Sequence, residues 1–310
     1  MTVEIVRPGL LTTLQDRGRS GWAMLGVGTA GAMDYVALRL ANALVGNPPR
    51  AAALEITLIG PRLRFDEPAT IALTGAEHPD VPMWRAVRVD SGSVLDFGNA
   101  RHGARAYLAI AGGFAVEHML GSASTDVNAK LGGRPLREGD RLVIGDSHPT
   151  ESHPAWSLDP RPWFDADPAT PIRLIRGAHF EALDGASRIA LFEREFRIAA
   201  DSNRVGYRLD GPRLALSAPL ELVSEPLAAG TVQLPPGGQP IALMAEHPTV
   251  GGYPRIGHVA AVDLALLAQR KPGDPVRFAE IGLDDAQTRY LERERALALL
   301  IEAIHERLMQ

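Results

Sequence analysis

Cysteine is absent from this sequence of 310 residues. Its absence excludes disulfides, thiolate metal sites, iron–sulfur clusters and a cysteine nucleophile. Long apolar runs are also missing: Asp263 interrupts the stretch Ala260 to Leu267, which is far shorter than the roughly 20 residues that span a bilayer. Near the N-terminus, Glu4 and Arg7 stand where a signal peptide needs an unbroken apolar core. We therefore expect a cytoplasmic protein with no membrane contact.

Clusters of basic residues are lacking as well. The net charge is −5, and no Lys/Arg stripe of the kind that binds phosphate backbones is present, so nucleic acid is not expected as a partner. The sequence contains no P-loop, no H-E-x-x-H motif and no G-x-S-x-G elbow. The nine histidines are scattered, and we predict no metal site.

Glycine and proline are plentiful, at 31 and 24 residues, and they punctuate short apolar runs. This pattern predicts a mainly β protein with a few helices. Helical periodicity is confined to residues 34–45, 262–269 and 284–308. The expected strands are Val3–Val6, Arg62–Phe65, Thr70–Thr74, Val94–Phe97, Arg105–Ile110, Ile172–Ile175, Tyr207–Leu209, Pro240–Ala245 and Val276–Phe278.

A segment rich in His, Pro, Asp and Ser, with no sustained apolar period, lies near the middle of the chain. Such composition is typical of a linker between domains. We therefore predict a first domain over 1–145, a linker over 146–170, a second domain over 171–282 and a C-terminal helix over 283–310.

The segment Gly26 to Gly31 fits the G-x-G-x-x-G pattern of dinucleotide-binding folds. That site requires a buried strand directly before the glycines, so that the following helix faces the pyrophosphate. The preceding residues, DRGRSGW, are polar instead. We interpret the segment as a glycine-rich loop that leads into a helix.

Polar residues gather in loops of both halves. In the first half, Gln15, Asp16 and Arg19 place an amide, a carboxylate and a guanidinium in one turn, which could bind a carboxylate or a carbamoyl group. A surface turn held by its own ion pairs explains the same residues.

The second half carries two such loops. Arg204 and Tyr207 lie in the segment DSNRVGYR, and His247, Thr249 and Tyr253 lie in EHPTVGGYP. The paired glycines of the latter let the backbone approach a ligand, with His247 and Tyr253 as acid, base or orienting donor. A plain hairpin turn accounts equally well for the glycines.

Taken together, these loops resemble one known family. The blocks LLTTLQDRGRSGW, GVGTAGAMDYVALRLANALVGN, RAYLAIAGGF, LGSASTD, SNRVGYRLDGP, SEPLAAGTVQLPPGGQPIAL and TVGGYPRIGHV are similar to allophanate hydrolase subunit 2. That family is also described as the C subunit of 5-oxoprolinase, the kinase-inhibitor antagonist protein, or the biotin-dependent carboxyltransferase family. The resemblance covers most of residues 3–281.

The resemblance implies two cyclophilin-like β-barrel domains. It also implies a subunit of an amide-processing enzyme, either an ATP-dependent 5-oxoprolinase that opens 5-oxoproline to glutamate, or the carboxyltransferase module of urea carboxylase and allophanate hydrolase. The expected partners are a subunit 1 or B-type protein and an A-type subunit, and the expected substrate is a small amide or lactam. We expect no cofactor on this chain itself; ATP or carboxybiotin would come through the partner subunits.

On this basis we predict catalytic roles for Asp16, His247 and Tyr253. The predicted substrate-binding residues are Gln15, Arg19, Asp34, Arg204, Tyr207 and Thr249. The sequence departs from the family pattern at Asn203, Val205, Pro248 and Val250, which leaves the substrate open. The rival hypothesis is a non-catalytic regulator that binds and antagonises an inhibitor of a sensor kinase.

Overall fold

The computed structural model describes residues 1–146 and 156–309. The chain divides into two compact units, called here the first and second domains. The division falls after Ala166, inside the segment 146–170 predicted as a linker, and residues 147–155 of that segment lie outside the described residues. The first domain comprises Met1–Arg19, Ala30–Ala166 and Ala296–Gln310, and the second comprises Ser20–Thr29 and Asp167–Arg295.

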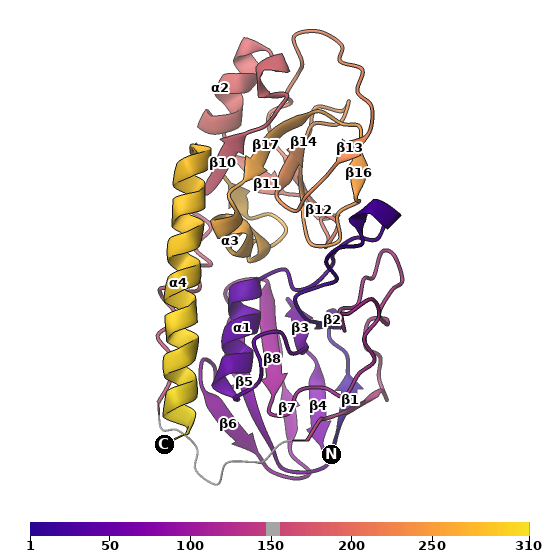
Figure 1. Cartoon of the computed structure of the whole chain (residues 1–310), viewed down its shortest axis with the longest axis vertical. Helices are drawn as coiled ribbons and strands as arrows, with labels where there is room; N and C mark the ends of the chain where they lie inside the picture. The colour runs from indigo at the N-terminus through magenta and orange to yellow at the C-terminus, as the bar shows by residue number, and fades with distance from the viewer. Residues whose placement is uncertain (147–155, 310) are drawn as a thin grey trace. The chain divides into compact units, whose positions relative to one another are not determined.

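Two antiparallel sheets form the first domain (Figure 1). In order across the sheet, the five-stranded one contains β2 (Leu11–Gln15), β3 (Ala53–Thr57), β8 (Arg105–Ile110), β5 (Ala69–Gly75) and β6 (Ala86–Val89). The four-stranded one contains β7 (Val94–Asp96), β4 (Arg62–Phe65), β1 (Thr2–Arg7) and β9 (Arg141–Val143). Both sheets contribute to one apolar core, in which Val3 and Phe65 of the smaller sheet join Ile56 and Leu108 of the larger.

Helix α1 (Tyr35–Leu44) packs on β5 and β8 of the larger sheet (Figure 1). Its buried face forms a second apolar cluster, with Leu38 and Ala41 against Tyr107 and Ala109 of β8. Strand β8 is therefore buried on both faces, which explains why it reads as a continuous apolar run rather than an alternating one.

The second domain contains one eight-stranded sheet that closes on itself. In order, its strands are β18 (Pro275–Val276), β11 (Phe196–Ile198), β12 (Gly206–Asp210), β15 (Ile241–Leu243), β14 (Thr231–Gln233), β17 (Arg255–Val259), β10 (Ile172–Arg176) and β19 (Phe278–Glu280). The two terminal strands, β18 and β19, are separated in sequence by Arg277 alone. The continuous segment of β18 and β19 pairs with β11 on one side and with β10 on the other, so the sheet closes into a barrel.

A separate two-stranded ribbon also belongs to the second domain. It pairs β13 (Glu225–Pro226) with β16 (Val250–Gly251). We call this pair of strands the ribbon. Its strand β16 belongs to the segment EHPTVGGYP, in which the sequence predicts site residues.

The described residues contain three further α-helices and three short 3-10 helices. They are α2 (Gly185–Glu193), α3 (Leu264–Ala268), α4 (Leu283–Leu308), η1 (Ala23–Leu25), η2 (Phe180–Ala182) and η3 (Ala261–Asp263). Within the described ranges, none of these helices combines the length and the apolar content needed to cross a membrane. The structure confirms the predicted fold class, mainly β with a few helices and two barrel-like domains.

Candidate functional site

In the first domain, the loop that follows β2 is organised around Asp16. One carboxylate oxygen, Oδ1, accepts hydrogen bonds from Ser122 Oγ (2.6 Å), Ser124 Oγ (2.6 Å) and the Gly18 amide (2.7 Å). The other, Oδ2, accepts from the Ala123 amide (2.7 Å). Burial alone would raise the pKa of Asp16, but the hydrogen bonds outweigh it and hold the pKa below its ordinary value. Asp16 is thus a stable carboxylate that joins two loops, and a weak proton acceptor.

We expect Asp16→Asn to lower the free energy of unfolding at neutral pH by about 1–3 kcal/mol, because the side-chain NH₂ would face groups that now donate to it. Since the folded pKa lies below the ordinary value of 3.8, the stabilisation is complete above that value and is lost as the pH falls through the folded pKa. Denaturant unfolding at neutral and acid pH measures both effects. The wild type and the variant should converge in acid; a constant difference would contradict the assignment.

Gln15 and Arg19 lie against the same loop as Asp16 and are almost fully buried, at 0% and 1% exposed. Gln15 Nε2 donates to Thr125 O (2.8 Å), and Arg19 Nη2 donates to the adjacent carbonyl, Ser124 O. Gln15 Oε1 and Arg19 Nη1 have no hydrogen-bond partner among the residues that the structure describes. One is an acceptor and the other a donor, which is the combination that an amide group could satisfy.

Asp34 stands at the start of α1 in the first domain. Its Oδ1 accepts from the amides of Val36 (3.1 Å) and Ala37 (2.9 Å), so it is the N-cap of the helix. The Asp34 amide donates to Tyr107 Oη (2.7 Å), which in turn donates to Glu55 Oε2 (2.7 Å). Burial, with the charges of Glu55 and Asp34, raises the pKa of Tyr107 well above its ordinary value.

The Asp34 cap also bears on whether the segment Gly26 to Gly31 can bind a nucleotide. A carboxylate already occupies the N-terminal amides of α1, where a nucleotide phosphate would have to bind. The residues directly before Gly26 form the 3-10 helix η1 rather than a strand. The loop interpretation of Gly26 to Gly31 is therefore confirmed.

In the second domain, Arg204 and Glu246 form a buried ion pair. Arg204 Nε donates to Glu246 Oε1 (2.6 Å), and the two side chains are 3% and 2% exposed. The Glu246 amide also donates to Arg204 O (2.8 Å), which joins the two predicted loops. Tyr207 is likewise buried and donates its hydroxyl to Ala268 O (3.3 Å). The side chains of Arg204 and Tyr207 therefore both form hydrogen bonds to other residues of the second domain.

His247 follows this ion pair. Its Nδ1 lies 2.8 Å from Pro248 O, and because a carbonyl can only accept, Nδ1 carries the proton. In the neutral ring, Nε2 is then free of hydrogen and can act as a base. Thr249 directly precedes β16, Tyr253 follows it after Gly252, and Tyr253 is 47% exposed. The structure thus places both at the ribbon, and their predicted roles stay predictions.

Sequence reasoning missed the residues of β14 and β17 beside the ribbon. Thr231 and Gln233 are each 5% exposed, and His258 faces Thr231 across the strand pair. A side chain added to Gly251 would come within 3.0 Å of Gln233 Nε2, so the ribbon backbone lies directly against this amide. The signal in the sequence was slight: Gln233 is one polar residue inside the run GTVQLPP.

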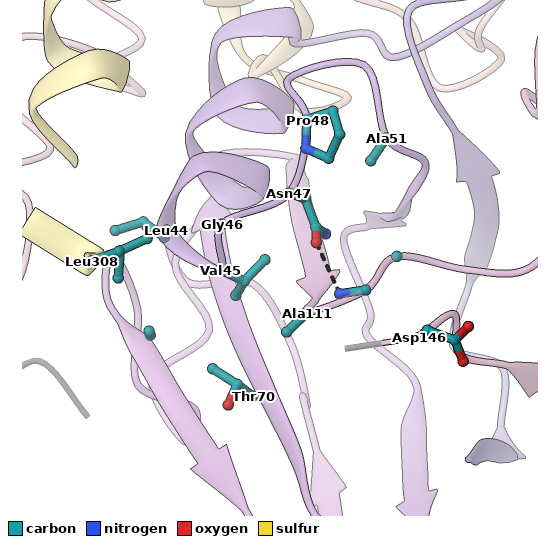
Figure 2. Close-up of a pocket in the computed structure, with 13 residues that line it drawn as sticks. Leu44, Val45, Gly46, Asn47, Pro48, Ala51, Thr70, Ala111, Asp146 and Leu308 are labelled. Atoms are coloured by element: carbon teal, nitrogen blue, oxygen red, sulfur yellow. Dashed lines mark hydrogen bonds between the residues drawn. The ribbon is translucent and has the colours of Figure 1, made fainter. Parts of the chain in front are cut away.

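A cavity of about 430 Å³ lies elsewhere in the first domain, at the C-terminal end of α1 (Figure 2). Apolar side chains and loop backbone line most of it, including Leu44, Ala111 and Leu308. Its amide side chain, Asn47, is already paired: Nδ2 donates to Ile110 O (2.8 Å) and Oδ1 accepts from the Gly112 amide (3.0 Å). None of the predicted site residues lines this cavity. In the described ranges, no group of three or more His, Asp or Glu side chains could hold a metal ion.

Comparison with known proteins decides the family. The model of the carboxyltransferase domain, subdomain A and B, matches residues 25–280. The chain belongs to this carboxyltransferase domain family. The chain is 38% identical to the C subunit of 5-oxoprolinase from Escherichia coli, over 98% of this chain and 99% of that protein.

Members of the carboxyltransferase domain family also occur inside longer proteins. Urea amidolyase of Saccharomyces cerevisiae is 30% identical over 92% of this chain, but the match covers 17% of that protein. The crystal structure of Kluyveromyces lactis urea carboxylase superposes with a TM-score of 0.82 at 28% identity, over 96% of this chain and 29% of that one. The predicted family resemblance is confirmed.

Proposed function

We propose that this chain is the C-type subunit of an ATP-dependent 5-oxoprolinase, which opens the lactam of 5-oxoproline to give glutamate. The observation that carries the proposal is the extent of the match. The chain covers 99% of the E. coli 5-oxoprolinase protein and 17% of the yeast urea amidolyase, so its length corresponds to the former.

The proposal includes partners. A relative that is named as one lettered subunit of an enzyme implies companion subunits, here a B-type and an A-type protein that assemble with this chain in the cytoplasm. ATP would bind to a companion, since the N-terminus of α1, the one helix that follows the glycine-rich segment, is occupied by the Asp34 carboxylate. In this proposal ATP supplies the free energy for opening the lactam.

We place the reaction in the second domain, at His247, Thr249 and Tyr253. Ring opening adds water to the lactam carbonyl, breaks the C–N bond and leaves a carboxylate and an amine. His247 Nε2 can accept a proton from the water, because Nδ1 is held by Pro248 O. The exposed Tyr253 hydroxyl can donate a proton to the leaving nitrogen, and the Thr249 hydroxyl can bind the carbonyl oxygen.

The roles proposed for the first domain are narrower. The unpartnered atoms of Gln15 and Arg19 offer an acceptor and a donor for an amide group within the first domain, separately from the reaction site of the second domain. Asp16 holds the loop on which they lie, and Asp34 holds the start of α1. Arg204 positions the loop that carries His247, and Tyr207 joins β12 to α3. In this proposal neither side chain contacts the substrate.

Hydrolysis of ATP that depends on 5-oxoproline tests the proposal. We expect activity when the chain is assembled with its companion subunits, and none when it is omitted. Within the active complex, His247→Gln should lower kcat by about 100-fold or more, the usual contribution of a general base. The matched control is His102→Gln, an exposed histidine of the first domain, which should leave kcat unchanged. A fully assembled complex without activity would refute the proposed function.

A further inference from the structure

The outer face of β14 and β17 carries four polar side chains close together. The register pairs Thr231 with His258 and Gln233 with Arg255. In a regular strand, Arg255 and His258 would point to opposite faces, because they are three residues apart. The pairing shifts between Val232 and Gln233, and this bulge turns both side chains to the same face.

Two hydrogen-bond donors on this face have no partner among the residues that the structure describes. Gln233 Nε2 and Arg255 Nε are both buried atoms without a hydrogen-bond partner in the described part of the chain. Gln233 is 5% exposed as a residue. An unsatisfied buried donor costs about 1–3 kcal/mol, so each of these two atoms calls for a partner from outside the described residues, such as water or a ligand.

Arg255 is anchored through one terminal nitrogen of its guanidinium and through its backbone. Its Nη2 donates to Glu225 of β13, and its backbone amide donates to His179 Nδ1 (3.1 Å). The guanidinium is therefore fixed in position, with Nε left for a second acceptor. Because Arg255 and Gln233 are cross-strand partners, the two free donors lie on neighbouring side chains.

The ribbon covers this pair. Gly251 has no side chain, and one would meet Gln233 Nε2 at 3.0 Å and Leu227 Cδ1 at 2.7 Å. Thr249 and Tyr253 flank Gly251 in the chain and belong to the reaction site proposed above. Burial lowers the pKa of His258, so at neutral pH its ring adds no charge to the face.

We propose that Gln233 and Arg255 form a carboxylate-binding site under the ribbon, and that this site holds the carboxylate of 5-oxoproline. The inference rests on the proposed function, which it deepens. Two neighbouring N–H donors, one of them on a guanidinium, match the two oxygens of a carboxylate. Urea has no carboxylate, so these residues set the choice between 5-oxoproline and urea.

The test uses Gln233→Met, which preserves the length of the side chain and removes the donor. In the assembled complex we expect KM for 5-oxoproline to rise about 10- to 100-fold, the usual loss for a hydrogen bond to a charged group. KM for the analogue of 5-oxoproline in which a neutral carboxamide replaces the carboxylate should not change. The Gln233→Met protein should be at least as stable as the wild type. Gln239→Met, at a partly buried glutamine of the same domain, is the matched control and should leave both KM values unchanged.

Direct binding separates the two proposals. Calorimetric titration of the full chain with 5-oxoproline, and with the carboxamide, measures the site without ATP hydrolysis. Preference for the carboxylate that disappears in Gln233→Met supports the site even if the complex proves inactive, in which case the proposed function alone fails. An active complex whose KM for 5-oxoproline is unaffected by Gln233→Met overturns the site and leaves the function standing. An equal rise in both KM values also overturns it, since the residue would then only support the ribbon.

Discussion

Arg204→Ala should destabilise the second domain by about 3–5 kcal/mol, because it leaves the Glu246 carboxylate buried without its partner. Hydrogen exchange of the β12 and β15 amides measures this effect within the domain concerned. A loss of that size speeds exchange of the slowest amides by about 100-fold or more. Replacement of both partners by apolar residues, as in Arg204→Met with Glu246→Leu, should recover most of the loss.

The matched control is Arg208→Ala. Arg208 Nε lies 3.0 Å from Asp201 Oδ2, but the two side chains are 56% and 67% exposed. Water screens such a pair, and its removal should cost less than about 1 kcal/mol. Equal effects of the two alanine variants would show that burial of the Arg204 pair does not determine its contribution.

Gly132→Ala should destabilise the first domain by about 3–5 kcal/mol, from two causes that add. Gly132 has a φ of +69°, where a side chain strains the backbone. Its added Cβ would also lie 2.2 Å from Ser124 O and 2.6 Å from Arg19 Nη2. Neither neighbour can move freely, because Arg19 is buried and donates to Ser124 O. Denaturant unfolding followed through the fluorescence of the buried Trp84 measures the loss.

Gly139→Ala separates the two causes. Gly139 has a φ of +83°, but no atom lies within 4 Å of the position that an added methyl group would occupy. The variant carries the backbone strain alone and should cost about 1–2 kcal/mol. If both glycine variants lose the same amount, the close approach of Arg19 to Gly132 contributes nothing to stability.

Periodicity predicted the helices at 34–45, 262–269 and 284–308, which correspond to α1, α3 and α4. It missed α2, a short helix with Ser187 and Leu191 as its buried residues and therefore a weak apolar stripe. The run Val276–Phe278 was predicted as one strand. In the structure it is split at Arg277 into β18 and β19, because each half pairs with a different edge of the same sheet. The apolar pattern of a strand does not show which neighbouring strand it will pair with.

Composition located the polar loops, but it did not show which side chains would meet in the folded protein. Spacing alone does not show that Arg204 meets Glu246, 42 residues later, or that Asp16 meets Ser122 and Ser124. Gln233 and Arg255 were missed for the same reason, since the fold brings them together and neither stands in a polar motif. The structure thus adds the partners of the predicted residues, and their roles in a site stay predictions.

Closure of the second-domain barrel has a consequence for how the protein is made. The ribosome releases β18 and β19 after every other strand of that sheet, so the nascent barrel has two open edges until residue 280 has emerged. Open strand edges recruit other chains. Products of premature termination before Pro275 should therefore collect as aggregates, and slower translation through the preceding segment would prolong the exposed state.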